Sequence, residues 1–408
     1  MLTTPNNAAI ADSSELFLKH HQLLSNRLRA VNEMMYPPEA KKTLRTFSTP
    51  EVSKLLGVTQ SNLRRLVSEQ KGPSPLRLDN SHRAYSLEQI NELRHYFASI
   101  HADQAQQFTP TRDPAEHLQV LAVANFKGGS AKTTTCLHLS HYLALHGYRV
   151  LVIDLDPQAS LSTMFGFQPE LNIAENETIY ACLRYDEYRR SINEVIQPTY
   201  FEGIDIIPGN LEVMEFEFTS PLAVANSSGR AGELFFNRLH DALGEIDQHY
   251  DVVLLDSPPT LGYLSLVSFF ASTGIVITAH PAMVDINSMN QFLKMFGELT
   301  SVFKDRGANL SKDSLNYCLT RNDPNNQAHV QGASLLRSLF NDHVYTPTAL
   351  LSVAVEQAGL AKKSVYELQA GEVQRNTLLR ARDAMDHVNE AIVQTLWYNW
   401  GRTERKAA

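Results

Sequence analysis

LQVLAVANFKGGSAKTT, residues Leu118–Thr134, decides the fold of this 408-residue chain. Leu118–Asn125 has the mostly apolar character of a buried strand, and Thr134–His146 continues with the apolar spacing of a helix. The glycines between them let backbone N–H groups converge on phosphate oxygens, and the start of the helix adds partial positive charge. The segment therefore predicts a phosphate site between a strand and a helix.

The predicted phosphate site comprises Lys127, Gly128, Gly129, Ser130, Ala131, Lys132, Thr133 and Thr134. Lys132 is expected to reach the β and γ phosphates, and the Thr133 hydroxyl to complete a Mg²⁺ shell. The usual GxxxxGK[ST] pattern is broken, because Phe126 and Ala131 stand where its two glycines would be. A plain glycine-containing turn is the alternative interpretation.

Two later apolar runs end in carboxylates. Val150–Gln158 closes on Asp154 and Asp156, and a second run closes on Asp256, which is suited to hold Mg²⁺ through water. Ligands of open α/β sheets bind at the carboxyl ends of the strands. A single acidic residue after a strand would more often be a helix cap or a turn former. Here the phosphate loop is followed along the chain by an Asp-x-Asp-Pro segment and then by an apolar run that ends in Asp, and this order favours a nucleotide site.

At these residues the chain resembles the deviant Walker A ATPases of the ParA and MinD superfamily, whose loop reads KGGxxK[ST]. The resemblance runs from about Leu118 to the C-terminal region. It implies ATP or ADP with Mg²⁺, a Lys127 that reaches the nucleotide of a second subunit, and a dimer. It also assigns the attacking water to Asp156, the magnesium environment to Asp154 and the Walker B role to Asp256.

Two further segments, 280–288 and 319–324, resemble ParA segments beside the nucleotide pocket. Without the family, a strand-end proline at Pro281 and a turn at Asn322-Asp323-Pro324 would explain them. Nitrogenase-type iron proteins share the loop but need cluster cysteines, and Cys136, Cys182 and Cys318 form no such pattern.

Short apolar runs alternate with helical patterns from Leu118 onward, at 118–125, 149–154, 203–208, 251–256 and 274–280. This alternation predicts an α/β fold with a mostly parallel sheet covered by helices. We expect four parts: an N-terminal helix within 1–44 that could serve dimerisation, a winged helix-turn-helix domain at 45–100, a polar linker at 101–116 and the ATPase domain at 117–408.

Residues 47–66 divide into two short helices around Gly57, with Ser48 or Thr49 and Thr59 as caps. The second helix would expose groups able to contact bases or phosphates, and Arg83 follows in the wing; the expected DNA contacts are Gln60, Ser61, Asn62, Arg64, Arg65 and Arg83. This domain resembles the winged helix-turn-helix of MerR-type regulators. A small helical packing module with solvated arginines is the alternative.

A leading helix and a helix-turn-helix before the ATPase resemble the long plasmid ParA proteins, most closely the RepA family of repABC cassettes. The resemblance implies a slow, partner-stimulated plasmid partition ATPase that also represses its own operon. Its partners would be operator DNA, non-specific DNA and a ParB-type, RepB-like centromere-binding protein. The alternatives are a nucleotide-sensing repressor without a motor role and a MinD-like membrane-cycling ATPase.

The formal net charge of −8 restricts any DNA contact to local patches, and Lys362 and Lys363 are the candidates near the C-terminus. No N-terminal leader pattern is present, so we expect a cytoplasmic protein, and the resemblance to the ParA proteins implies that it is nucleoid-associated. The last helix combines an apolar stripe with Trp397, Tyr398 and Trp400. Packing on the ATPase domain explains this stripe better than a membrane anchor, because Glu390 and Glu404 interrupt the basic face.

Overall fold

The computed structural model describes residues 13–35, 42–77, 83–226, 235–304, 308, 310–369 and 371–402. The chain divides into an N-terminal unit ending at Thr43 and a larger unit that begins at Leu44. Helix α1 (Ser13–Met35) forms the first unit, and Leu23 and Leu24 on it are 60% and 61% exposed. The side chains of Leu28, Val31 and Met35, which the sequence places on the same apolar face, lie outside the described residues.

The larger unit begins with a small winged helical domain. Its elements are β1 (Phe47–Ser48), α2 (Thr49–Leu56), α3 (Gln60–Ser68), β2 (Leu76–Arg77), β3 (Arg83–Tyr85) and α4 (Leu87–Ile100). Ser48 and Glu51 form a capping box at α2, and the Thr59 hydroxyl accepts the Asn62 N–H at 3.2 Å at the start of α3. Gly57 ends α2 with φ 64°, which a glycine adopts without strain.

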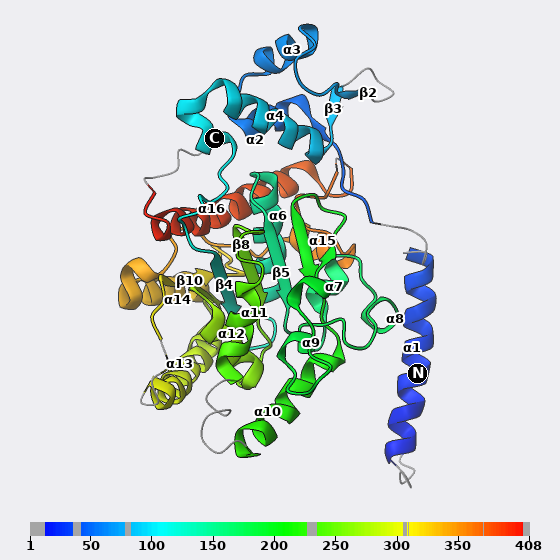
Figure 1. Ribbon diagram of the computed structural model, residues 1–408, viewed down its shortest axis with the longest axis vertical. Coiled ribbons are helices and arrows are strands. Elements are labelled where there is room, and N and C mark those ends of the chain that lie inside the picture. The colour runs from blue at the N-terminus through cyan, green and yellow to red at the C-terminus, as the bar shows by residue number, and fades with distance from the viewer. Residues whose placement is uncertain are drawn as a thin grey trace. The chain divides into compact units, whose positions relative to one another are not determined.

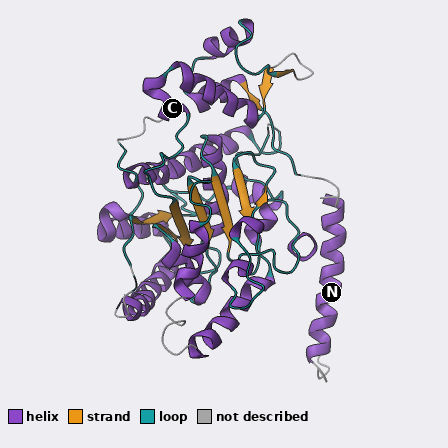
Figure 2. Ribbon diagram, viewed as in Figure 1, coloured by secondary structure: helices purple, strands orange, loops and turns teal. Residues whose placement is uncertain are grey.

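A seven-stranded sheet forms the centre of the ATPase domain, as Figure 2 shows in orange. The strand order is β10-β9-β4-β8-β5-β7-β6, and every neighbouring pair is parallel except β6 with β7. The strands are β4 (Gln119–Ala124), β5 (Val150–Asp154), β6 (Gln197–Pro198), β7 (Ile204–Ile207), β8 (Val252–Asp256), β9 (Gly274–Ala279) and β10 (Ser314–Leu319). The predicted fold class is confirmed.

Helices cover both faces of this sheet (Figure 1). Successive residues of each strand point to opposite faces, so Leu121 and Val123 join one core while Val120 and Ala122 join the other. The first core includes α6 (Lys132–Leu145), α15 (Val353–Leu360) and α16 (Arg375–Asn399). The opposite face carries α9 (Tyr180–Leu183), α10 (Glu215–Asn226), α11 (Arg238–Gly244), α12 (Tyr263–Ala271), α13 (Met283–Lys304) and α14 (Gln327–Phe340). Short helices α5 (Ala105–Phe108), α7 (Ser160–Met164) and α8 (Pro169–Asn172) lie in connections.

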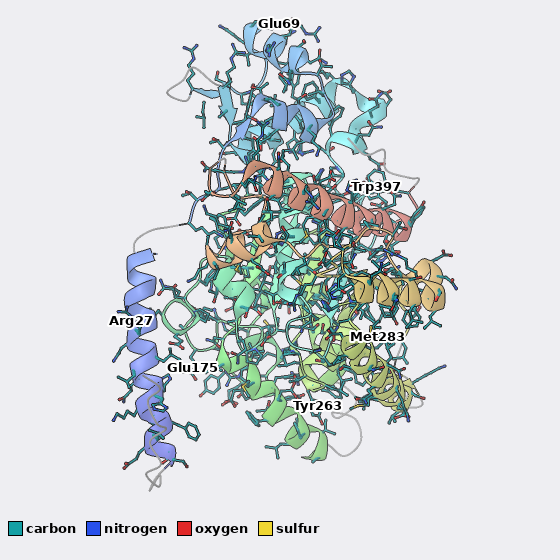
Figure 3. All side chains as sticks on the ribbon, turned by 180° about the vertical axis from the view of Figure 1, so that it is seen from behind. Arg27, Glu69, Glu175, Tyr263, Met283 and Trp397 are labelled. Carbon is teal, nitrogen blue, oxygen red and sulfur yellow. The ribbon has the colours of Figure 1, made fainter. Side chains whose placement is uncertain are left out.

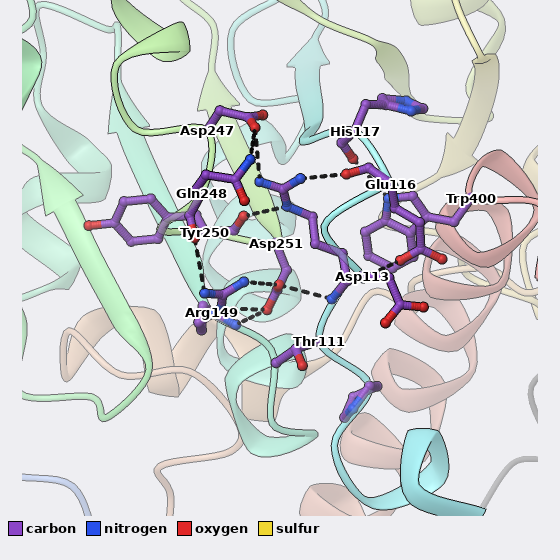
Figure 4. A network of polar contacts seen from close by, with 12 residues as sticks. Thr111, Asp113, Glu116, His117, Arg149, Asp247, Gln248, Tyr250, Asp251 and Trp400 are labelled. Atoms are coloured by element: carbon purple, nitrogen blue, oxygen red, sulfur yellow. Dashed lines mark hydrogen bonds and ion pairs between the residues drawn. The ribbon is translucent and has the colours of Figure 1, made fainter.

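Residues 101–116, expected from their composition to be a polar linker, are packed in place. Phe108 stacks on Phe97 with ring centroids 5.4 Å apart, and the guanidinium of Arg112 is buried. The buried carboxylate of Asp251 accepts the Arg112 backbone N–H at 3.1 Å and the Arg149 Nη2 at 2.7 Å, while Arg112 Nε donates to the Tyr250 carbonyl at 2.9 Å (Figure 4). This network attaches the connection to the amino ends of β5 and β8.

The apolar stripe of α16 packs into the ATPase core. Trp397, labelled in Figure 3, donates its indole N–H to the Tyr148 hydroxyl at 2.7 Å, and Trp400 donates to the His117 carbonyl at 2.9 Å. The guanidinium of Arg402 lies over both indole rings. Core packing is therefore the role of this stripe. In the described part of the chain, we find no helix with the length and apolarity that crossing a bilayer requires.

Candidate functional site

The predicted phosphate loop connects the carboxyl end of β4 to the start of α6. Gly129 and Ala131 both have left-handed backbone, with φ 76° and 68°, so the loop reverses sharply before the helix. Asn125 holds the beginning of the loop: its Oδ1 accepts the Lys127 N–H at 2.9 Å, and its Nδ2 donates to the Thr278 carbonyl at 2.5 Å. The strand–loop–helix context required for phosphate binding is present.

Side chains from the ends of β9 and β10 hold the other half of the loop. Thr278 donates to the Ser130 hydroxyl at 3.1 Å, and Thr320 donates to the Ser130 carbonyl at 2.9 Å. Arg321 reaches the Gly129 carbonyl at 3.0 Å through Nη1. The resemblance had singled out the segment that contains Thr320 and Arg321 without a role, and Thr278 was missed. Polar residues at the ends of buried strands were the available signal.

Lys132 and Thr133 begin α6 and turn toward the acidic strand ends. Lys132 is only 7% exposed, and its Nζ lies 3.5 Å from the Lys127 carbonyl. Burial lowers the pKa of Lys132, although the carboxylates of Asp256 and Asp156 act in the opposite direction. The Thr133 hydroxyl donates to Asp256 Oδ2 at 2.7 Å. A cationic and a hydroxyl group are therefore together beneath the loop.

Asp256 ends β8 in a buried position, 1% exposed. Burial, together with the nearby Asp154 carboxyl, raises its pKa to about 8. Its Oδ1 is buried and has no hydrogen-bond partner, although Oδ2 accepts from Thr133. A buried acceptor beside a second carboxyl suits a hydrated divalent cation, so the residues present fit a Mg²⁺ ion.

Asp154 lies beside Asp256 because these residues are paired in the register of β5 and β8. Its Oδ1 accepts the Asp156 N–H at 3.2 Å, and its Oδ2 accepts the Ser162 N–H at 2.8 Å and hydroxyl at 2.7 Å. Both oxygens of Asp154 are thus engaged with the following loop. The carboxylate therefore shapes the turn that presents Asp156, and its position beside Asp256 leaves the predicted place in the magnesium environment a prediction.

Asp156 is half-buried at the same edge of the sheet. One of its carboxylate oxygens accepts the Gln158 N–H at 2.9 Å, which fixes the side chain in the turn after β5. Lys132, Thr133, Asp156 and Asp256 therefore lie close together at the ends of three neighbouring strands, β4, β8 and β5.

Lys127 points away from this group. Its ammonium forms an ion pair with Asp285 in the first turn of α13, and its side chain is 41% exposed. The two lysines of the loop therefore have different surroundings, one buried under the loop and one outside it.

The expected DNA-binding groups of the winged domain lie on its surface. Ser61, Arg64 and Arg65 are exposed on α3, and Gln60 and Asn62 are half-buried. Arg83 is exposed on β3, directly opposite Arg77 on β2. This is the placement expected of a recognition helix and a wing.

Lys362 and Lys363 follow α15 and are less suited to a phosphate contact. Lys363 Nζ forms an ion pair with Glu372 Oε1 at 2.5 Å, which offsets its charge. Lys362 has left-handed backbone, φ 52°, and partial burial lowers its pKa.

Known proteins match this chain along almost its whole length. A predicted replication protein A of Sinorhizobium fredii is 45% identical over 388 residues, which span 95% of each chain, and one of Rhizobium rhizogenes is 41% identical over 387. The chain belongs to this plasmid RepA family of the ParA and MinD superfamily. A family described as AAA domain matches residues 118–306, and the protein SopA of Escherichia coli is 30% identical over 268 residues, 64% of this chain and 66% of SopA.

Solved structures show the same fold as this RepA-family chain. A structure described as a partition protein aligns with a TM-score of 0.64 at 19% identity, covering 94% of this chain and 99% of its own. An ATP complex of a McdA variant from Cyanothece aligns with a TM-score of 0.55 at 18% identity over 68% of this chain and 98% of its own. The shared region is that of a P-loop ATPase.

Proposed function

We propose that this chain is a plasmid partition ATPase that dimerises when it binds ATP and uses the dimer to bind DNA. One observation carries the proposal: the two lysines of the phosphate loop are separated, with Lys132 buried beside Asp256 and Lys127 outside the loop. Lys132 is placed for the nucleotide of its own subunit. Lys127 does not face the nucleotide of its own subunit, and its ammonium lies at the surface, where a second subunit can reach it. In a dimer it would offset the negative charge of the two nucleotides that face each other.

The residues at the loop divide the work of holding Mg²⁺ and ATP. The amides of residues 128–134 and Lys132 would bind phosphate oxygens, and Thr133 and Asp256 would hold the ion, Asp256 through water. Mg²⁺ would offset the negative charge of the phosphates as ATP and water become ADP and phosphate. Asp156 would orient the attacking water from the turn that Asp154 fixes.

DNA binding has two supports in this chain. The exposed face of α3 and the wing arginines suit an operator, in keeping with repression of its own operon. Non-specific binding would involve further basic residues, to which Lys363 contributes little because of Glu372. A ParB-type centromere-binding protein would stimulate hydrolysis, which is the partner that the resemblance to the ParA proteins implies. Non-specific DNA binding would keep the protein associated with the nucleoid.

A repressor that only senses nucleotide is the second candidate. The placement of Asp156 at the loop favours hydrolysis over simple sensing. The membrane-cycling alternative loses its main support, because the aromatic end of α16 is committed to the ATPase core.

The decisive experiment combines ATPase assays, with and without DNA, with sedimentation in ATP or ADP. We expect a dimer in ATP and slow turnover that DNA and the partner accelerate. Lys132→Ala should lose nucleotide binding, whereas Asp156→Ala should dimerise in ATP and lose turnover by about 100-fold or more. A monomer in every state would contradict the proposal, and normal turnover in Asp156→Ala would assign the chemistry elsewhere.

A further inference from the structure

The ion pair between Lys127 and Asp285 links the phosphate loop to helix α13. Asp285 Oδ1 contacts the Lys127 ammonium, while Asp285 Oδ2 accepts from His280 Nδ1 at 3.2 Å. The Asp285 side chain is 21% exposed, against 41% for Lys127. Asp285 therefore lies at the inner, more restrained end of the pair.

Neighbouring elements fix the position of Asp285. His280 follows β9, and its ring packs edge-on against the His329 ring of α14, with centroids 4.7 Å apart. His329 Nδ1 accepts the Asp323 N–H at 3.1 Å, which ties the same group to the turn after β10. Gly332 of α14 packs so closely on the Pro281 carbonyl that it leaves no room for a Cβ. The carboxylate is a preformed acceptor, and Lys127 is the mobile partner.

The backbone of Lys127 is also restrained, since Asn125 holds its N–H and Lys132 approaches its carbonyl. Release of the ammonium from Asp285 thus requires only side-chain rotation. The loop itself need not rearrange.

We propose that Asp285 is a positioning residue that holds Lys127 in the nucleotide-free monomer and competes with dimerisation. The inference rests on the dimer proposed above. When two ATP-bound subunits meet, each Lys127 exchanges the Asp285 carboxylate for phosphate oxygens of the opposite nucleotide. The Asp285 carboxylate keeps His280 as its neighbour. Dimerisation then opens two such ion pairs, one in each subunit.

The expected effect follows from this stoichiometry. Partly exposed ion pairs of this kind change an equilibrium by about two- to fivefold. Because each dimer opens two pairs, Asp285→Asn should raise the dimerisation constant in saturating ATP by about four- to 25-fold. Asn retains the size of Asp and a hydrogen-bond acceptor for His280, so the surrounding packing is preserved.

The test is sedimentation of the full chain across protein concentrations in a saturating, non-hydrolysable ATP analogue. The variants are Asp285→Asn, Lys127→Ala, the double variant and Asp241→Asn, which removes an acid from the first turn of α11 as a matched control. We expect tighter dimerisation for Asp285→Asn alone, and no effect of Asp285→Asn in the Lys127→Ala background.

Each outcome has one interpretation. A wild-type chain that stays monomeric in the analogue contradicts the proposed dimer itself. A wild-type dimer with unchanged or weakened affinity in Asp285→Asn overturns the role of Asp285. The same gain in the Lys127→Ala background, or in Asp241→Asn, also overturns it, because the effect would then come from helix-terminal charge and not from Lys127.

Discussion

Ala131 is the residue at which this phosphate loop departs furthest from the usual pattern. It stands where GxxxxGK[ST] has glycine, yet it keeps the left-handed backbone, φ 68° and ψ 29°, that the glycine would adopt easily. A non-glycine residue in this conformation costs roughly 1 kcal/mol. The contacts of Ser130 with Thr278 and Thr320 offset that strain and hold the loop in shape.

Ala131→Gly should therefore stabilise the folded chain by up to about 1 kcal/mol, less the extra freedom that glycine gives the unfolded state. Urea unfolding of the nucleotide-free protein measures this change, with Ala174→Gly in a surface connection as the control. Clear destabilisation by Ala131→Gly would show that the left-handed conformation at residue 131 carries no strain.

Asp256 gives the site a predictable response to pH. Because burial raises its pKa to about 8, the folded chain binds this proton more tightly than the unfolded chain between the usual carboxyl range and pH 8. The contribution of Asp256 to stability is thus present at low pH and is lost as pH rises toward 8. Asp256→Asn should raise the melting temperature of the nucleotide-free protein at pH 8 by a few degrees, and by less at pH 5.

Calorimetry at the two pH values, without nucleotide or Mg²⁺, tests this expectation. Asp241→Asn, on the surface, is the control and should shift both melting temperatures equally. An equal shift in Asp256→Asn would mean that Asp256 is ionised throughout. With Mg²⁺ and ATP added, the wild-type chain should gain more stability than Asp256→Asn.

Among the elements, helix α3 can be tested for DNA binding by a substitution that leaves the ATPase domain unchanged. Arg64 lies exposed on it, with Nη2 3.4 Å from Gln60 Oε1. Arg64→Ala should weaken binding to DNA from upstream of its own gene by about 1–3 kcal/mol if Arg64 contacts a base edge. Turnover of ATP should not change. Lys294→Ala, which removes an exposed cation from α13, is the control for net charge.

Footprinting at two salt concentrations distinguishes the two kinds of contact. If Arg64→Ala loses more affinity for the operator than for unrelated DNA, Arg64 contacts a base edge. If it loses the same affinity for both, and its binding depends less steeply on salt, Arg64 contacts a phosphate. An unchanged footprint would remove Arg64 from the interface.

The strands that can be predicted well from the sequence are the buried ones, because burial makes them nearly continuous apolar runs. β5 and β8 are buried throughout and β4 is buried up to its last residue, so their apolar runs locate them to within a residue or two. β10 was not predicted, because Ser314 and Asn316 interrupt its apolar run at the edge of the sheet. β6 has only two residues, one of them Pro198, and gives no pattern to detect.

The site divides in the same way. The loop and Asp256 can be predicted from sequence because the loop directly follows the buried strand β4 and Asp256 ends the buried strand β8. The partners that shape the site, Asp285 for Lys127 and Ser162 for Asp154, come from packing between distant or irregular segments. No local spacing signals such contacts, and this is why the sequence did not predict that Asp154 shapes the turn before Asp156.

For the whole molecule, the network around Asp251 joins the winged domain's connection to the sheet. Arg112→Ala removes the bonds of the guanidinium to the Tyr250 and Glu116 carbonyls and its ion pair with Asp247. One buried and one part-buried carbonyl would lose a charged donor, so we expect destabilisation by about 2–4 kcal/mol. Arg190→Ala, which breaks the pair with Glu194 and a bond to the Asn176 carbonyl at 3.0 Å, should cost less, about 1 kcal/mol.

Urea unfolding followed by circular dichroism measures both variants. Equal stability of Arg112→Ala and wild type would show that residues 110–116 are held by other contacts. A second, earlier transition in Arg112→Ala would show that the network keeps the two domains unfolding together.

The tryptophans of α16 give the protein a built-in optical probe. The chain has two tryptophans, Trp397 and Trp400, and both pack at the same junction with Tyr148 and His117. Intrinsic fluorescence excited at the red edge therefore reports the docking of the C-terminal helix. The recognition helix and the phosphate loop contain no tryptophan, so an emission change on adding ATP or DNA would mean that binding there changes the surroundings of α16.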